Sequence, residues 1–159
     1  MPRPCDEHYL KRTIELARTG SRNGEGGPFG ALIVQRDEII AEAWNQVLHC
    51  CDPTAHAEIG AIRAAARKLG RFHLDDCVLY ASSEPCPMCL AATYWARIPR
   101  IVYANSRAEA AAIGFCDDAL YAELARDCTA RQLEMHHLPL DDASEMMREW
   151  SLKCDRQLY

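Results

Sequence analysis

The sequence predicts an α/β protein with three layers (α/β/α), in which helices cover both faces of a mixed five-stranded sheet. Short runs of branched apolar residues alternate with segments whose apolar residues recur every three or four positions, as in strands and amphipathic helices. Two of the apolar runs are separated only by Arg36-Asp37, which predicts an antiparallel hairpin. Two others flank a helix, which predicts a parallel pair. A sheet with both kinds of pairing is mixed.

The elements of the N-terminal half are marked by periodicity and by the residues at their ends. We expect a helix over residues 6–19, strands over 31–35 and 38–43, a loop over 44–53 and a helix over 54–69. Gly20 and Gly70 stand where a helix end favours a left-handed residue, and Thr54 can cap the second helix. His56 and Glu58 then lie in the first turn of that helix.

The C-terminal half continues the alternation of strands and helices. We expect a strand over 77–81, a helix over 87–96, a strand over 98–104, a short helix after Ser106, a helix over 119–126, a strand over 132–138 and a helix over 142–154. Pro87 suits the first position of a helix and places Cys86 at its cap. Trp95 and Trp150 have the spacing of core residues on their helices.

Length and composition favour one domain over residues 1–159, with 155–159 as a short tail. No apolar run is long enough to span a membrane, and the first residues lack the apolar core of an export signal, so we expect a cytoplasmic protein. The nine cysteines should therefore be mostly reduced thiols. The net charge of -5 makes a nucleic-acid partner unlikely.

Two short motifs carry the chemistry of the chain: His56-Ala57-Glu58 and Pro85-Cys86-Pro87-Met88-Cys89. One imidazole and two thiolates can hold a zinc ion and leave its fourth position to water, as in catalytic zinc sites. The combination H-x-E and P-C-x-x-C is the signature of zinc-dependent deaminases, which act by hydrolysis. The sequence therefore predicts His56, Cys86 and Cys89 as metal ligands, with one zinc ion per subunit.

The cysteine pair fits a redox centre or a structural zinc site less well. A redox pair leaves the His-x-Glu motif without a role, and a structural zinc site needs a fourth Cys or His at matching spacing. Glu58 alone could be an acid that complements a helix dipole, a role that can coexist with catalysis. Zinc lowers the pKa of its bound water toward about 7, and Glu58 is the expected carrier of protons from that water to the substrate.

Three segments resemble the cytidine deaminase superfamily: Gly26 to Gly30, Asp52 to Glu58 and Glu84 to Cys89. Within it the chain is most similar to the bacterial guanine deaminases, on Tyr94-Trp95-Ala96-Arg97, on Gly114-Phe115 with Asp117 close behind, and on its terminal tyrosine. The resemblance implies a cytidine deaminase-like fold and deamination of guanine to xanthine and ammonia. It also implies a homodimer that can exchange C-terminal segments.

By the same resemblance, Asn45 and the backbone N–H of Ala57 would bind the purine base, Phe29 would line its pocket and Asp117 would meet the amino group. Tyr159 would close over a site with the C-terminal tail. Two simpler roles stay open, since Asp117 could cap the following helix and Tyr159 could be a frayed end. Rival functions are deamination of another amino-heterocycle or nucleoside, such as guanosine or an aminotriazine, of adenosine in tRNA, or a non-catalytic zinc protein.

Overall fold

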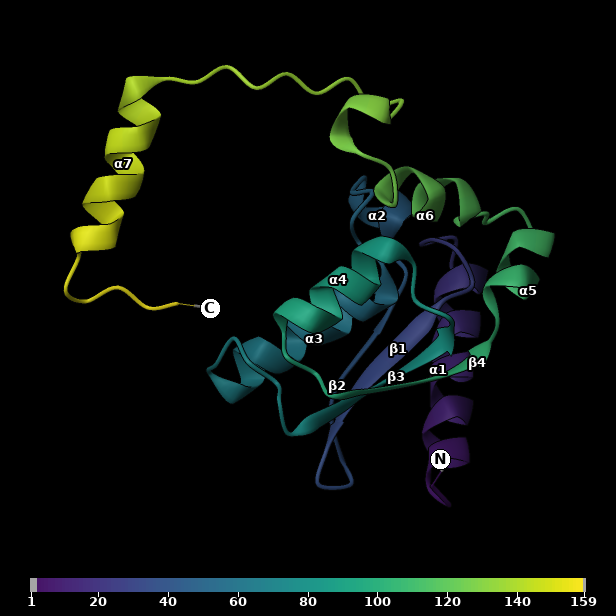
Figure 1. The fold of residues 1–159 in the computed structure, drawn as a ribbon. Coiled ribbons are helices and arrows are strands. Elements are labelled where there is room, and N and C mark those ends of the chain that lie inside the picture. The colour runs from purple at the N-terminus through teal and green to yellow at the C-terminus, as the bar shows by residue number, and fades with distance from the viewer. Residues whose placement is uncertain (1–2, 159) are drawn as a thin grey trace. The chain divides into compact units, whose positions relative to one another are not determined.

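The computed structural model describes residues 3–158, and these residues divide after Asp117 into two compact units. The first unit contains α1 (Asp6–Arg22), β1 (Gly30–Gln35), β2 (Glu38–Trp44), α2 (Val47–Cys50), α3 (Ala57–Leu69), β3 (Cys77–Ser83), α4 (Pro87–Trp95), β4 (Arg100–Asn105) and α5 (Arg107–Ala112) (Figure 1). The second contains α6 (Asp118–Leu124), the 3-10 turn η1 (Cys128–Ala130) and α7 (Asp141–Leu152). None of the described helices is long and apolar enough to cross a membrane.

The first unit is built on a mixed sheet with the strand order β2-β1-β3-β4. Strands β1 and β2 form the predicted antiparallel hairpin, and both residues of its turn, Arg36 and Asp37, have positive φ as tight hairpin turns require. Strand β1 is also antiparallel to β3, whereas β3 and β4 are parallel across the helix that joins them. The hairpin and the parallel pair are therefore confirmed.

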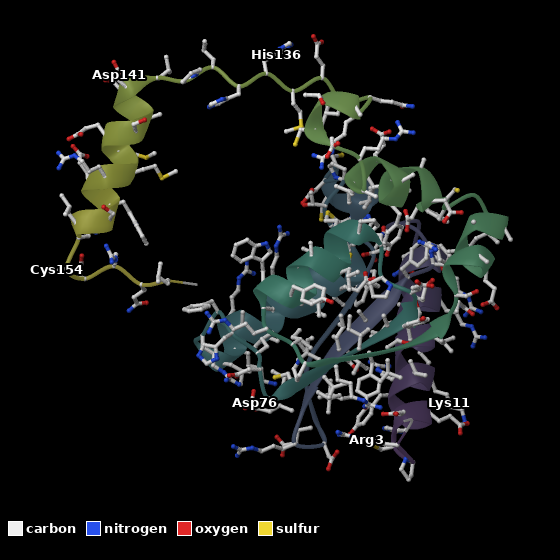
Figure 2. The ribbon with its side chains drawn as sticks, viewed as in Figure 1. Arg3, Lys11, Asp76, His136, Asp141 and Cys154 are labelled. Carbon is white, nitrogen blue, oxygen red and sulfur yellow. The ribbon has the colours of Figure 1, made fainter. Side chains whose placement is uncertain are left out.

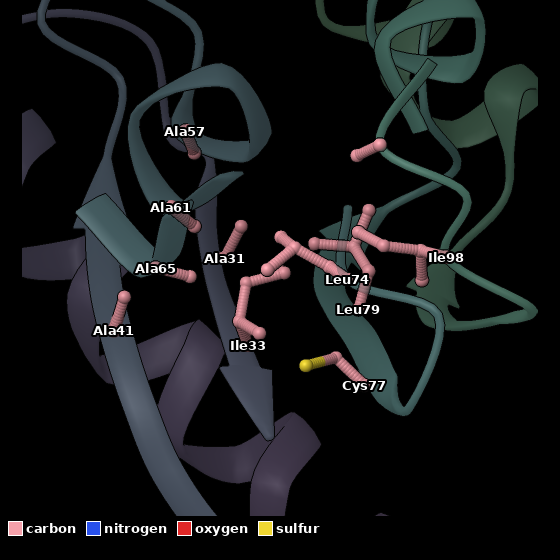
Figure 3. Packing of buried hydrophobic residues seen from close by; sticks show 11 residues of the cluster. Ala31, Ile33, Ala41, Ala57, Ala61, Ala65, Leu74, Cys77, Leu79 and Ile98 are labelled. Atoms are coloured by element: carbon pink, nitrogen blue, oxygen red, sulfur yellow. The ribbon is translucent and has the colours of Figure 1, made fainter. Parts of the chain in front are cut away.

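Helices cover both faces of this sheet because the residues of its central strand β1 alternate between two apolar clusters. On one face, Tyr9 of α1 packs with Leu32 and Val34 of β1. On the other face, Ala31 and Ile33 pack with the residues of α3 that repeat every four positions, Ala57, Ala61 and Ala65 (Figure 3). Because these alanines are small, the helix backbone can lie close to the sheet. The alanine row of α3 thus sets where the first turn of that helix lies.

The expected fifth strand is absent, since the sheet has four strands within the described residues. Residues 132–138 instead form an irregular, mostly exposed segment of the second unit, on which His136 lies (Figure 2). The backbone N–H of Gln132 donates to the carboxylate of Glu123 rather than to a strand. An alternating pattern makes a strand only where another strand can pair with it, and this segment has none.

Three local predictions were also wrong. Gly20 does not end α1, and a side chain there would collide with the Trp44 ring at 2.2 Å, so this glycine allows close packing. Thr54 does not cap α3, because its hydroxyl and N–H both donate to Asp52 and the helix begins after His56. Trp95 and Trp150, which have the spacing of core residues, are exposed.

A buried ion pair ties the start of α1 to the sheet. The carboxylate of Asp6, which is 3% exposed, accepts hydrogen bonds from Arg100 of β4 at 2.6 and 3.0 Å and from the Tyr80 hydroxyl at 2.7 Å. The Arg100 guanidinium holds the pKa of Asp6 well below its ordinary value. One carboxylate therefore links three elements that are far apart in the sequence.

We expect Asp6→Asn to lower the free energy of unfolding by about 2 kcal/mol at neutral pH, because Arg100 and Tyr80 lose a charged partner. Since the folded-state pKa is depressed, this stabilisation is fully present above the unfolded pKa of about 4 and is lost progressively as the pH falls from there through the folded-state pKa. Urea denaturation between about pH 6 and pH 3 should therefore show the two proteins converging. Glu7→Gln, which removes an exposed ion pair with Lys11 on the same helix, is the matched control and should have a much smaller effect. Equal effects of the two substitutions would contradict this account.

Candidate active site

The candidate site lies where two helices of the first unit begin. His56 is the N-cap of α3 and Cys86 is the N-cap of α4, and both have extended backbone dihedral angles, with Pro87 at the start of α4 as predicted. Glu58 follows in the first turn of α3 and Cys89 in the first turn of α4. Ile59 of α3 packs against both cysteines, which holds the two helix starts together.

The three predicted ligands have the geometry that a zinc ion needs. The Nδ1 atom of His56 lies 3.5 Å from the sulfur of Cys86 and 3.5 Å from the sulfur of Cys89. A tetrahedral zinc ion, about 2.3 Å from sulfur and about 2.0 Å from nitrogen, separates those atoms by about 3.5 Å. In residues 3–158 this is the only group of three or more His, Cys, Asp or Glu side chains that could hold a metal ion. The residues therefore fit the ion that the sequence predicts.

The ionisable groups of the site differ in their affinity for protons. Hydrogen bonds from the Cys89 thiol and from His56 lower the pKa of Cys86 to about 4, while the same contact and burial raise the pKa of Cys89. Glu58 is 8% exposed, and burial raises the pKa of its carboxyl group above the ordinary value. The site therefore combines a thiolate, which can bind a metal ion, with a carboxyl group that readily holds a proton.

Two cavities open beside the ligands and share Phe29, His56 and Phe115. The inner cavity has a volume of about 60 Å³ and is also lined by Glu58, Ser83, Glu84, Cys86, Ala110 and Asp117. The outer cavity has a volume of about 300 Å³ and is also lined by Gly27, Asn45, Val47, Leu48 and Pro53. The rings of Phe29 and Phe115 meet edge to face, 4.8 Å apart. The two cavities thus share aromatic walls and the predicted ligand His56.

Asn45 is oriented by the backbone around it. Its Oδ1 atom accepts hydrogen bonds from the N–H groups of Gly27 at 3.2 Å and Val47 at 3.3 Å, and the residue is buried, with 5% of its surface exposed. The oxygen is therefore occupied, and the NH2 group is the part of the amide that can donate to a ligand. A side chain at Gly26 would meet that oxygen at 2.1 Å, so the close approach requires glycine there.

Glu25 braces both neighbours of Asn45, a role that the sequence does not reveal. Its carboxylate accepts hydrogen bonds from Trp44 Nε1 at 2.7 Å and from Gln46 Nε2 at 3.0 Å. Its backbone carbonyl accepts from the N–H groups of Leu48 and His49, which lie in the short helix α2. No spacing rule links Glu25 to these residues, because the contacts form only when the loop before β1 meets the loop after β2.

The structure brings together most of the predicted site residues. His56, Glu58, Cys86, Phe29 and Asp117 all line the inner cavity, and Asn45 lines the outer one. Ala57 is fully buried as the first residue of α3.

Asp117 also directly precedes α6, a position compatible with a capping role. Tyr159 lies outside the described residues. The inner cavity adds Ser83 and Glu84, which sequence analysis did not single out. The Glu84 carboxylate accepts a hydrogen bond from the backbone N–H of Arg107 at 3.0 Å.

Comparisons with known proteins agree with this geometry. The chain is 44% identical to the guanine deaminase of Bacillus subtilis over 96% of its own length and 98% of that protein. The X-ray structure of guanine deaminase from Bacillus subtilis matches the fold with a TM-score of 0.93 over the same shares of the two chains. The chain is also 33% identical to a tRNA-specific adenosine deaminase of Aquifex aeolicus, over 92% of its length and 94% of that protein.

The family model that describes the cytidine and deoxycytidylate deaminase zinc-binding region matches residues 3–105. That range contains the three candidate ligands, Glu58 and Asn45, and it ends at the last residue of β4. Motif, metal geometry, fold and sequence similarity point the same way, and the chain belongs to the zinc-dependent cytidine and deoxycytidylate deaminase family.

Proposed function

We propose that this protein is a zinc-dependent aminohydrolase that converts guanine to xanthine and ammonia. The observation that carries the proposal is the buried carboxyl group of Glu58 in the same 60 Å³ cavity as His56 and Cys86. An outer cavity with aromatic walls and an oriented Asn45 amide suits a purine base. The full-length similarity to a guanine deaminase supports guanine in particular.

His56, Cys86 and Cys89 would hold the zinc ion, which when bound supplies an activated water molecule at neutral pH. Glu58 takes a proton from the attacking water and delivers it to the ring nitrogen, and it then takes the second proton, from the new C–OH group, and passes it to the departing amine. Burial suits Glu58 to this work, because a raised pKa lets the carboxyl group hold a proton between the two transfers. The reaction replaces the C–NH2 group by C=O and releases ammonia.

The substrate is held by groups from several elements. The Asn45 NH2 group donates to an acceptor on the purine, and the backbone N–H of Ala57 donates to a second. Phe29 packs against the ring, and its contact with Phe115 keeps it in place. Asp117, in the inner cavity with Glu58, accepts from the amino group that leaves.

Ammonia release from guanine, guanosine, cytosine, adenine and tRNA by the zinc-loaded protein tests this function. We expect guanine to be the best substrate. Preference for tRNA would instead indicate a tRNA adenosine deaminase, the function named for the Aquifex aeolicus relative, and RNA binding should then weaken steeply with salt. Zinc binding without ammonia release from any of the five would refute the enzymatic proposal.

We expect Glu58→Gln to keep the zinc content and the fold but to lower kcat for guanine by about 10³-fold. The substituted side chain has the same shape and cannot carry the proton. Steady-state kinetics and metal analysis of the same preparation provide the measurement. Turnover close to that of the unmodified protein would exclude Glu58 as the proton carrier.

We expect Glu25→Ala to lower kcat/KM for guanine by about tenfold, because Trp44 and Gln46 lose their shared acceptor and Asn45 loses its fixed position. Most of the loss should appear in KM, since the metal ligands and Glu58 are untouched. Glu15→Ala removes an exposed carboxylate from α1 and serves as the control. Equal kinetics for the two variants would show that the brace has no role in binding.

In this proposal the protein acts as a homodimer whose subunits exchange their C-terminal segments. The apolar side chains of α7, including Met146, Met147 and Trp150, are exposed, and so are Tyr94 and Trp95 of α4. Exposed apolar side chains in such numbers favour a partner surface.

The nine cysteines are free thiols, which fits a cytoplasmic location.

Deletion of residues 158–159 should lower guanine turnover and leave the circular dichroism spectrum unchanged, because the tail would close the site without stabilising the fold. Unchanged turnover would refute this role of Tyr159.

Co-expression distinguishes a tail that acts within its own subunit from one that acts on the partner. Mixed dimers of the deleted protein and the Glu58→Gln variant should regain activity if the tail closes the partner's site, since one site then has both parts. If the mixed dimers regain no activity, the tail closes the site of its own subunit.

A further inference from the structure

Two consecutive serines at the end of β3 differ in their hydrogen bonds. Because side chains alternate along a strand, Ser82 and Ser83 point to opposite faces of the sheet. The Ser82 hydroxyl accepts a hydrogen bond from the N–H of Gly30 at 3.0 Å. The Ser83 hydroxyl oxygen is buried and has no hydrogen-bond partner among residues 3–158.

The lone hydroxyl of Ser83 is costly to the fold. The residue is 7% exposed, and a buried polar group without a partner costs about 1–3 kcal/mol. The backbone of Ser83 is held in place, since Ser83 is paired with Asn105 of β4 and the N–H of Glu84 donates to the Asn105 carbonyl. A group that is held in such a position is satisfied when a molecule from outside the chain supplies the partner.

Ser83 lines the inner cavity together with His56, Glu58, Cys86 and Asp117. If guanine is the substrate, its reacting carbon and amino group must reach this cavity, because the metal ligands and the proton carrier are there. The amino group has two N–H donors. Asp117 can accept one of them, and the second needs another acceptor, which a hydroxyl oxygen can be.

We propose that Ser83 is a substrate-binding residue whose hydroxyl oxygen accepts a hydrogen bond from the amino group of the base. The inference rests on the proposed deaminase function and adds a specific contact to it. The hydroxyl is neutral, so it can hold the amino group without competing with Glu58 or Asp117 for a proton. The bond that it makes also satisfies the one polar side-chain atom of β3 that the fold leaves buried without a partner among the described residues.

The neighbouring serines allow a matched test. Ser83→Ala should lower kcat/KM for guanine by about 10- to 100-fold, and its melting temperature should be unchanged or higher, because a lone buried hydroxyl is removed. Ser82→Ala should lower the melting temperature, since the Gly30 N–H loses its acceptor, and should keep kcat/KM within about threefold. If Ser83→Ala keeps kcat/KM within about twofold, the proposal fails and the hydroxyl serves only to hold a water molecule.

Should Ser83→Ala lower both activity and melting temperature, the pair Ser83→Thr and Ser83→Val decides, because the two side chains have the same shape and only threonine keeps the hydroxyl. At least about tenfold higher kcat/KM for the threonine variant supports the contact, and equal values overturn it. The unmodified protein separates this proposal from the function on which it rests. Absence of ammonia release from guanine by that protein would refute the function, whereas normal release with an unaffected Ser83→Ala variant would refute the contact alone.

Discussion

The meeting of two helix N-termini is the constraint on which the rest of the site depends. His56 and Cys86 sit one residue before α3 and α4, where the backbone is extended and the side chain can point forward along the helix axis. Ile59 packs against both cysteines, and the sheet supports α3, which in turn contacts α4. The positive ends of two helix dipoles thus face the same point and stabilise thiolate there.

The sequence predicted this centre well because its signals are local. A proline at a helix start, two cysteines three residues apart and a two-residue hairpin turn each indicate the same local structure in any fold. The fifth strand was wrong because pairing depends on a partner that lies elsewhere in the chain. The hydrogen bonds of Asn45 and Glu25, which connect residues about twenty positions apart, likewise required the structure.

The resemblance to guanine deaminases added residues that no spacing argument could reach. It pointed to Asn45, Phe29 and Asp117, and the structure places all three beside the ligands or in the adjoining cavity. Ser83 shows the opposite case. It lies beyond the strand expected over 77–81, and only the finished fold showed that its hydroxyl is buried without a partner among the described residues. The metal ligands and the residues that we propose for ring recognition thus come from different parts of the chain.

The alanine row of α3 has a consequence for how such a protein can diverge. Ala57, Ala61 and Ala65 have almost no exposed surface, so a larger side chain at any of them would lift the helix from the sheet. His56 and Glu58 would move with the helix, and the rate of turnover would fall. Leu48 and Pro53, which line the outer cavity, are exposed and are not constrained in this way. Natural variation can therefore change the outer cavity so that it accepts other ring systems, while the helix and sheet beneath the metal site stay almost unchanged.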